Sequence, residues 1–224
     1  MMYSDGYNPA CWYKGVCEDC KGEDNCLRYK EMRFLMSKSN IPVIKRAPIQ
    51  LKVNSVDKDA YYRLAEIKDN IYNFVYDGKS LYITSSTTGN GKTSWSLKLL
   101  MKFFEEVLGE SGFEPRGLFI HVPTFLAKLK EFDKYDEEFD MIKKLIPVVD
   151  LVVWDDIAST DMSAYDLSQL TVYIDGRTMN EMANIYTGNI VNRDDMVSAL
   201  GLRLTSRIWN SHTEVIEFFG GDRR

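Results

Sequence analysis

The sequence predicts an α/β fold in which a five-stranded parallel sheet is sandwiched by helices. Five short apolar runs alternate along the chain with segments of helical periodicity. Each run is apolar at nearly every position, which is typical of parallel strands that are covered on both faces. A Gly-rich turn joins the first run to a helical segment, as in phosphate-binding α/β proteins. The 224 residues suffice for one such core and a small appended module.

The expected elements follow in chain order. Residues 1–40 contain all four cysteines and close with a helix at 28–39. Residues 41–57 have two prolines and no clear period, and they are predicted to be a linker. The main domain, 58–224, begins with a helix that ends near Gly78. Its strands are expected at 80–85, 117–123, 150–157, 184–189 and 214–220, with helices after the first and second strands.

The composition limits the possible partners. Apolar residues make up 45% and charged residues 27% of the chain, as in ordinary globular proteins. No apolar run approaches the length of about 18 residues that spans a membrane, and the N-terminus lacks a signal-peptide core. We therefore expect a cytoplasmic protein without a membrane partner. The net charge of −5 disfavours nucleic-acid binding by bulk electrostatics, so any DNA contact requires a local patch or a shared complex.

The sharpest motif is the turn SSTTGNGKTSW at residues 85–95. Gly91, Lys92 and Thr93 match the end of the phosphate-loop pattern G-x-x-x-x-G-K-[ST], although Ser86 occupies the position of the first glycine. In this pattern backbone N–H groups surround phosphate oxygens, the lysine reaches the β- and γ-phosphates, and the threonine hydroxyl ligates Mg²⁺. An ordinary Gly-rich turn is the alternative. The motif predicts binding of ATP and Mg²⁺ by Gly89, Asn90, Gly91, Lys92, Thr93 and Ser94.

Acidic and basic residues add two further candidates. The apolar run LVVWDDI ends in Asp155, which we assign to Mg²⁺, and Asp156, which we assign to activation of the attacking water. A solvated acidic pair is the alternative. Near the C-terminus, Arg203 and Arg207 lie four residues apart and therefore share one face of a helix. Two solvated arginines remain the alternative there. His121 falls within an apolar run and is expected to be a packed residue, and His212 is likewise without an identifiable partner.

In this order, the motifs of residues 58–224 resemble those of AAA+ ATPases, and specifically of the DnaC/DnaI helicase loaders of bacterial and phage DNA replication. The resemblance implies that Asn189 is the first sensor and that Arg207, rather than Arg203, is an arginine finger for a neighbouring subunit. It also implies a late arginine as a second sensor and a domain that lacks a C-terminal helical lid. Candidates for the late arginine are Arg223 and Arg224.

Most AAA+ enzymes have Glu where this chain has Asp156, so slow ATP hydrolysis is expected. The family implies ATP-controlled delivery of a replicative DNA helicase onto single-stranded DNA, with self-association or assembly on the helicase ring, in a bacterial cell or a bacteriophage-infected bacterium. Three alternatives remain open. They are an IstB-like transposition helper ATPase, an ATP-switched binding protein with little hydrolysis, and a zinc-dependent DNA-binding regulator with a vestigial phosphate loop.

The cysteines are confined to 16 residues, with the spacing C-x5-C-x2-C-x5-C. About forty residues cannot bury enough apolar surface to fold alone, and four thiolates complete a tetrahedral structural zinc site. An iron–sulfur cluster also accepts four cysteines. The predicted ligands are Cys11, Cys17, Cys20 and Cys26.

The layout of this module resembles the N-terminal modules of phage loaders, which implies contact with the helicase. Four aromatic residues are candidates for that contact or for the small core of the zinc site: Trp12, Tyr13, Tyr29 and Phe34.

Overall fold

The computed structural model describes residues 11, 25–46, 49–131, 136–159 and 161–221. Its centre is a five-stranded sheet with the order β2-β3-β4-β1-β5, in which all neighbours pair in parallel. The predicted sheet and its five strands are confirmed, with ends that differ by a few residues. The strands are β1 (Ser80–Thr84), β2 (Gly117–His121), β3 (Leu151–Ile157), β4 (Ala183–Gly188) and β5 (Thr213–Glu217).

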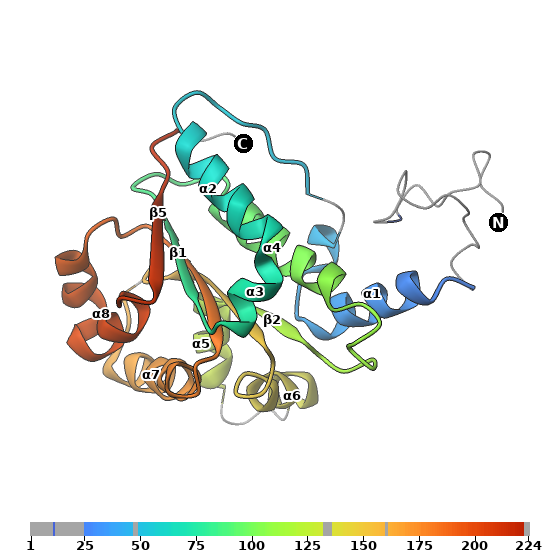
Figure 1. Ribbon diagram of the computed structural model, residues 1–224. Helices are drawn as coiled ribbons and strands as arrows, with labels where there is room; N and C mark the ends of the chain where they lie inside the picture. The colour runs from blue at the N-terminus through green and yellow to red at the C-terminus, as the bar shows by residue number, and fades with distance from the viewer. Residues whose placement is uncertain (1–10, 12–24, 47–48, 132–135, 160, 222–224) are drawn as a thin grey trace.

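Helices cover both faces of the sheet (Figure 1). Successive side chains of β1 show how the strands serve both layers, since Leu81 and Ile83 enter one core cluster and Tyr82 enters the other. The first layer contains α1 (Leu27–Lys38), α2 (Lys58–Asp69), α3 (Ile71–Tyr76) and α4 (Lys92–Glu106). The second contains α5 (Val122–Leu129), α6 (Glu137–Leu145), α7 (Ala164–Met179) and α8 (Arg193–Ile208).

The helix α1 belongs to the main core. Met32, Leu35 and Met36 are at most 1% exposed and join the cluster formed by α2, α3 and α4. The Glu31 carboxylate accepts hydrogen bonds from the Gly109 N–H and the Ser111 hydroxyl, just beyond the end of α4. The domain boundary that we predicted at residue 40 therefore follows a helix that packs on the main domain.

Two other predicted segments differ in detail. The single helix expected after residue 57 is two helices, α2 and α3, which meet at Asn70. The predicted linker contains a short 3-10 helix, η1 (Val43–Lys45). The Lys98 ammonium of α4 donates to the Ile49 carbonyl at 2.6 Å, so the linker is also attached to the core.

A buried arginine of α7 joins the second helical layer to the sheet. Arg177 is fully buried, and its guanidinium donates to five oxygen acceptors on β4 and on the segment that precedes β3. Asn184, one of these acceptors, also accepts from the Trp154 indole at 3.1 Å. Burial lowers the pKa of Arg177 to about 10, so the side chain remains a cation at neutral pH. The acceptors are the carbonyls of Ile146, Val149, Asp150 and Ala183 and the side-chain oxygen of Asn184.

Within the described part of the chain, no helix has both the length and the apolar character needed to cross a bilayer. The expected lack of a C-terminal helical lid stays a prediction.

Candidate nucleotide-binding site

The loop between β1 and α4 has the backbone of a phosphate-binding turn. Gly89 and Gly91 have φ values of 73° and 100°, a region that side chains with a Cβ rarely adopt, and Gly91 is the N-cap of α4. Ser86 is not among the positive-φ residues. The serine at the position of the first glycine therefore does not need the left-handed backbone that favours glycine.

Side chains within the loop close it around the lysine. The Lys92 ammonium donates to the Thr87 carbonyl at 2.8 Å and to the Asn90 side-chain oxygen at 3.3 Å. The Asn90 amide in turn donates to the Ser85 hydroxyl. The loop also reaches the end of the described chain, because the Thr87 hydroxyl donates to the Gly220 carbonyl at 2.9 Å. The predicted lysine is thus held inside the turn by the loop's own oxygens.

A hydroxyl and a carboxylate meet at the first turn of α4. The Thr93 hydroxyl donates to Asp155 Oδ1 at 2.8 Å, and Asp155 is 2% exposed at the carboxyl end of β3. Thr187 of β4 donates to the same oxygen at 2.7 Å, and its hydroxyl accepts from the Asp156 backbone N–H at 3.0 Å. A buried carboxylate beside a hydroxyl is a donor set that suits Mg²⁺, so these residues fit the predicted ion.

Asp156 points toward a different neighbour. The register of β3 and β4 shifts between Trp154 and Ile157, and Asp156 has a φ of 60° at this irregularity. Bulges of this kind redirect a side chain. The Asp156 carboxylate lies 3.6 Å from His121 Nε2, and His121 Nδ1 lies 2.7 Å from the Thr124 hydroxyl.

The prediction that His121 is a packed residue is therefore wrong. Its side chain is 42% exposed, and His121 is the last residue of β2. Its imidazole and the carboxylates of Asp155 and Asp156 place ligand atoms within 4.8 Å of one another.

Asn189 follows β4 directly and reaches the same site. Its side-chain oxygen is buried and has no hydrogen-bond partner among the described residues. The next residue is fixed, since the Ile190 carbonyl accepts from the hydroxyls of Tyr82 and Thr84 at 2.8 Å and 2.7 Å. An unpartnered amide oxygen at this position can accept a hydrogen bond from a water or a ligand, which fits the predicted sensor.

A cavity of about 810 Å³ lies beside the phosphate loop, and Asp155 and His121 are not among its lining residues. The phosphate loop from Thr88 to Trp95 forms one side, and Asp156 and Asn189 form another. Ser159 and the segment predicted as a linker provide the rest of the lining, and sequence reasoning missed the part played by the linker. Its contributing residues are Lys45, Gln50, Leu51 and Lys52.

Burial disfavours the charged forms of one cationic and one anionic side chain in this site. It lowers the pKa of Lys92, and Asp156 and Asp155 partly oppose the shift. Burial likewise raises the pKa of Asp155, against the hydrogen bonds from Thr187 and Thr93. A desolvated ammonium and a desolvated carboxylate would be stabilised by phosphate and by a divalent cation respectively.

The arginines lie elsewhere. Arg203 and Arg207 follow a break in α8 at Gly201, where φ is 77°, and both contact Asp175 of α7. The shared helix face is confirmed. Neither arginine lines the cavity described above. Arg223 and Arg224 fall outside the described residues.

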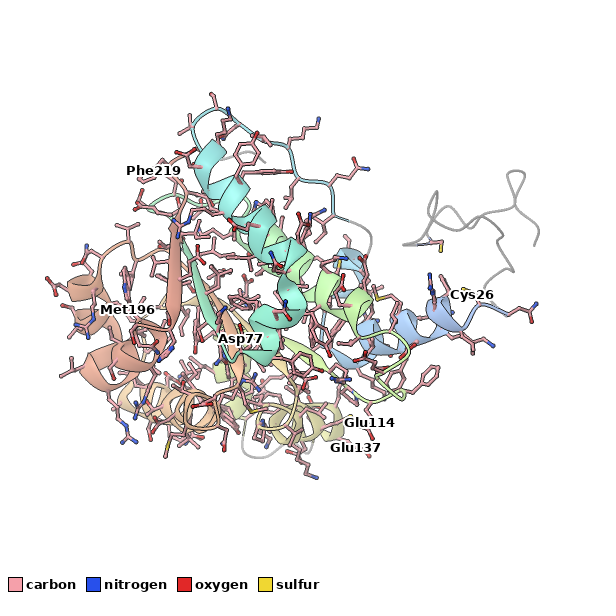
Figure 2. All side chains as sticks on the ribbon, in the orientation of Figure 1. Cys26, Asp77, Glu114, Glu137, Met196 and Phe219 are labelled. Carbon is pink, nitrogen blue, oxygen red and sulfur yellow. The ribbon has the colours of Figure 1, made fainter. Side chains whose placement is uncertain are left out.

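Of the predicted cysteine module, the structure describes Cys11 and residues 25–40. Cys17, Cys20, Trp12 and Tyr13 fall outside the described residues, so the structure does not test the four-cysteine site. Cys26 is the N-cap of α1 and accepts from the Tyr29 N–H at 3.5 Å (Figure 2). Phe34 packs against the main core and meets Phe113 edge to face at 5.6 Å.

No protein-family model and no curated protein matches this sequence. Solved structures do match it. A crystal structure of the DnaC helicase loader is 20% identical with a TM-score of 0.62, and the match covers 75% of this chain and 93% of that one. A structure of DnaI is 20% identical with a TM-score of 0.61, covering 83% and 95%. Domain III of the replication initiation protein DnaA from Thermotoga maritima is 17% identical with a TM-score of 0.54, covering 77% and 66%.

In this chain the phosphate loop, the acidic strand end and the polar strand end follow one another along a parallel sheet, as the motif order predicts. The chain therefore has the fold of the DnaC and DnaI structures.

Proposed function

We propose that this chain is an ATP-dependent helicase loader, which binds a replicative DNA helicase and delivers it onto single-stranded DNA. The observation that carries the proposal is the extent of the fold similarity. The match covers 93% and 95% of the DnaC and DnaI structures, but 66% of the DnaA domain. The fold similarity thus extends over almost the whole length of the two loader structures.

ATP binding and hydrolysis would be the switch. Lys92 would contact the phosphates, and Thr93 and Asp155 would hold Mg²⁺, supported by their contact at 2.8 Å. Bound Mg²⁺ would neutralise the charge that develops on the phosphates. Asp156 and Asn189 would orient the attacking water, and the unpartnered oxygen of Asn189 supports this role. The remaining phosphate-loop positions, Gly89, Asn90, Gly91 and Ser94, would surround the nucleotide.

Hydrolysis is proposed to be slow. Asp156 is one methylene shorter than the usual glutamate, and its carboxylate is 39% exposed beside His121. These observations also favour the second candidate, a binding protein that ATP switches with little turnover. In both cases Arg207 would act in the site of a neighbouring subunit, assembled by self-association or on the helicase ring. That neither Arg203 nor Arg207 lines its own chain's cavity supports this geometry.

The ends of the chain would add metal and partner contacts. Cys11, Cys17, Cys20 and Cys26 would bind structural Zn²⁺, and the N–H···S bond at Cys26 is one that metal-bound thiolates commonly accept. This module would contact the helicase, in the cytoplasm of a bacterium or a phage-infected bacterium. The contact between Thr87 and Gly220 brings the chain past the phosphate loop shortly before Arg223 and Arg224, which supports a late second sensor.

Helicase association and loading test the proposal directly. Tagged protein should retain a bacterial replicative helicase in a pull-down and should increase unwinding of a substrate on circular single-stranded DNA when ATP is present. Lys92→Ala should bind the helicase but fail to stimulate unwinding. The proposal is overturned if the wild-type chain binds ATP but neither captures the helicase nor alters unwinding.

A further inference from the structure

A single carboxylate on α7 holds both arginines of α8. Asp175 Oδ2 accepts from Arg203 Nη2 at 2.7 Å, and Asp175 Oδ1 accepts from Arg207 Nε at 2.5 Å. The Asp175 side chain is 12% exposed, against 39% for Arg207 and 73% for Arg203. The carboxylate is therefore a nearly buried, fixed point, and the two cations extend from it toward solvent.

The contact leaves the outer end of Arg207 available. Its guanidinium is held through Nε, and the described residues provide no other hydrogen-bond partner for its two terminal nitrogens. Those terminal groups are the donors that bind phosphate oxygens in a planar, two-point arrangement. A guanidinium held by its inner edge keeps this pair of donors and loses much of its rotational freedom.

The helices hold the carboxylate and the arginines in register. Gly201 breaks α8, so the turns that carry both arginines run separately from the first half of the helix. Leu204 and Ile208 anchor these turns in the second core cluster. Asp175 follows Ile174 of the same cluster, which fixes its position on α7. One negative and two positive charges leave a net positive face outside the chain's own nucleotide cavity.

We propose that Asp175 is a positioning residue that aligns Arg207 for the phosphates bound by a second copy of this chain. This inference rests on the proposed function, in which Arg207 acts across a subunit boundary. Asp175 acts through Arg207 and touches no nucleotide itself. Its carboxylate orders the arginine before assembly, so that the interface does not have to order it.

The first test is the turnover of the assembled ATPase with helicase and single-stranded DNA present. Asp175→Ala should lower kcat by about 10- to 100-fold, because a misplaced catalytic group costs on this order. The KM for ATP and the equilibrium affinity of each subunit for ATP should stay within about twofold, since Asp175 is remote from its own cavity. Asp175→Asn retains an oxygen acceptor for Arg207 and should lie between the wild type and Asp175→Ala.

Mixing subunits gives a readout that a merely structural defect would not move. Asp175→Ala has an intact phosphate loop, and Lys92→Ala has an intact Asp175–Arg207 pair. Where the two variants adjoin in a mixed assembly, a competent site receives a well-positioned arginine, so partial turnover should return. If Asp175→Ala does not fold by circular dichroism, Asp175→Asn takes its place in the mixture. The inference is overturned if the mixture turns over no faster than Asp175→Ala alone although mixed assemblies form.

Arg207→Ala separates this inference from the proposed function. It should lower turnover by roughly 10³-fold, as expected for an arginine acting in trans. If Arg207→Ala leaves turnover unchanged, the role of Arg207 in the proposed function fails and the role of Asp175 falls with it. If Arg207→Ala is inactive while both Asp175 variants turn over at the wild-type rate, only the positioning role of Asp175 is overturned.

Discussion

We expect nucleotide binding to depend most directly on Lys92. Its ammonium sits inside the loop with oxygens of Thr87 and Asn90, and burial lowers its pKa. Lys92→Ala removes the phosphate-facing charge without burying a new polar group. We expect ATP·Mg²⁺ binding to be abolished while the circular dichroism spectrum stays unchanged.

Lys102→Ala is the matched control for Lys92→Ala, because Lys102 lies on the same helix and pairs with Glu106 at the surface. Its ATP affinity, measured by calorimetry, should equal that of the wild type. Unchanged ATP binding in Lys92→Ala would contradict the assignment of this turn as a phosphate-binding loop.

Thr187 connects two residues of the site that lie about 30 positions earlier in the sequence. Its hydroxyl donates to the Asp155 carboxylate and accepts from the Asp156 backbone N–H. Thr187→Val keeps the shape of the side chain and removes both bonds. Loss of a group that orients a metal ligand typically costs about 10- to 100-fold in metal affinity or activity, so Mg²⁺-dependent ATP binding should weaken by that amount.

Thr187→Ser retains the hydroxyl and should keep an affinity close to that of the wild type in a titration of Mg²⁺ at fixed ATP. Equal Mg²⁺ dependence in Thr187→Val and the wild type would mean that Asp155 needs no support from Thr187.

The positions of the candidate residues could be predicted where they follow from features that are local in sequence. Lys92 and Thr93 belong to one turn, and the positions of Asp155 and Asn189 at strand ends follow from apolar runs that stop at polar residues. Thr187 and His121 were missed for a different reason. Their roles depend on which strands are neighbours in the sheet, and β3 lies between β2 and β4 only because of the crossover order. No spacing along the chain encodes that adjacency.

Among the elements, α7 depends most on one side chain. Arg177 satisfies four backbone carbonyls and the Asn184 side chain from a fully buried position. Arg177→Met fills similar space but leaves these acceptors without their hydrogen-bond donor, each at a cost of roughly 1–3 kcal/mol. Because several acceptors lose their donor at once, we expect the free energy of unfolding in urea to fall by about 3 kcal/mol or more.

Arg193→Met provides the comparison, since Arg193 is an exposed residue at the start of α8. Surface changes of this kind usually stay within about 0.5 kcal/mol. Equal urea midpoints for the two arginine variants would show that the buried network of Arg177 contributes little to stability.

The elements themselves differ in how far the sequence determines them. Strands were predictable because a parallel sheet covered on both faces requires continuous apolar runs. The packing of α1 was not, because its apolar residues were equally consistent with a small metal-stabilised core. The hydrogen bonds that the Glu31 carboxylate accepts from residues 109 and 111 distinguish the two possibilities, but residues this far apart in sequence meet only in the folded chain. The break in α8 at Gly201 was likewise hidden, since glycine is also tolerated within helices.

At the scale of the whole molecule, Cys26 lies at the junction of the predicted cysteine module and the main core. It caps α1, whose residues Met32, Leu35 and Met36 are buried against that core (Figure 2). Loss of a metal from the module should therefore release the chain before α1 and leave α1 in place. Hydrogen exchange should show lost protection in residues 1–26 and retained protection in residues 27–38. ATP affinity should stay unchanged, because the phosphate loop lies in the core.

The substitution of Cys26 separates its role as a cap from its predicted role as a metal ligand. Serine is a good N-cap, so Cys26→Ser should preserve the start of α1, but a hydroxyl does not replace a thiolate in a four-cysteine zinc site. Elemental analysis should find one zinc per wild-type chain and much less in Cys26→Ser, with Cys17→Ser behaving alike. If Cys26→Ser keeps its full zinc content, Cys26 serves α1 alone. Iron in the wild-type protein, or four titratable thiols without metal, would exclude a structural zinc site.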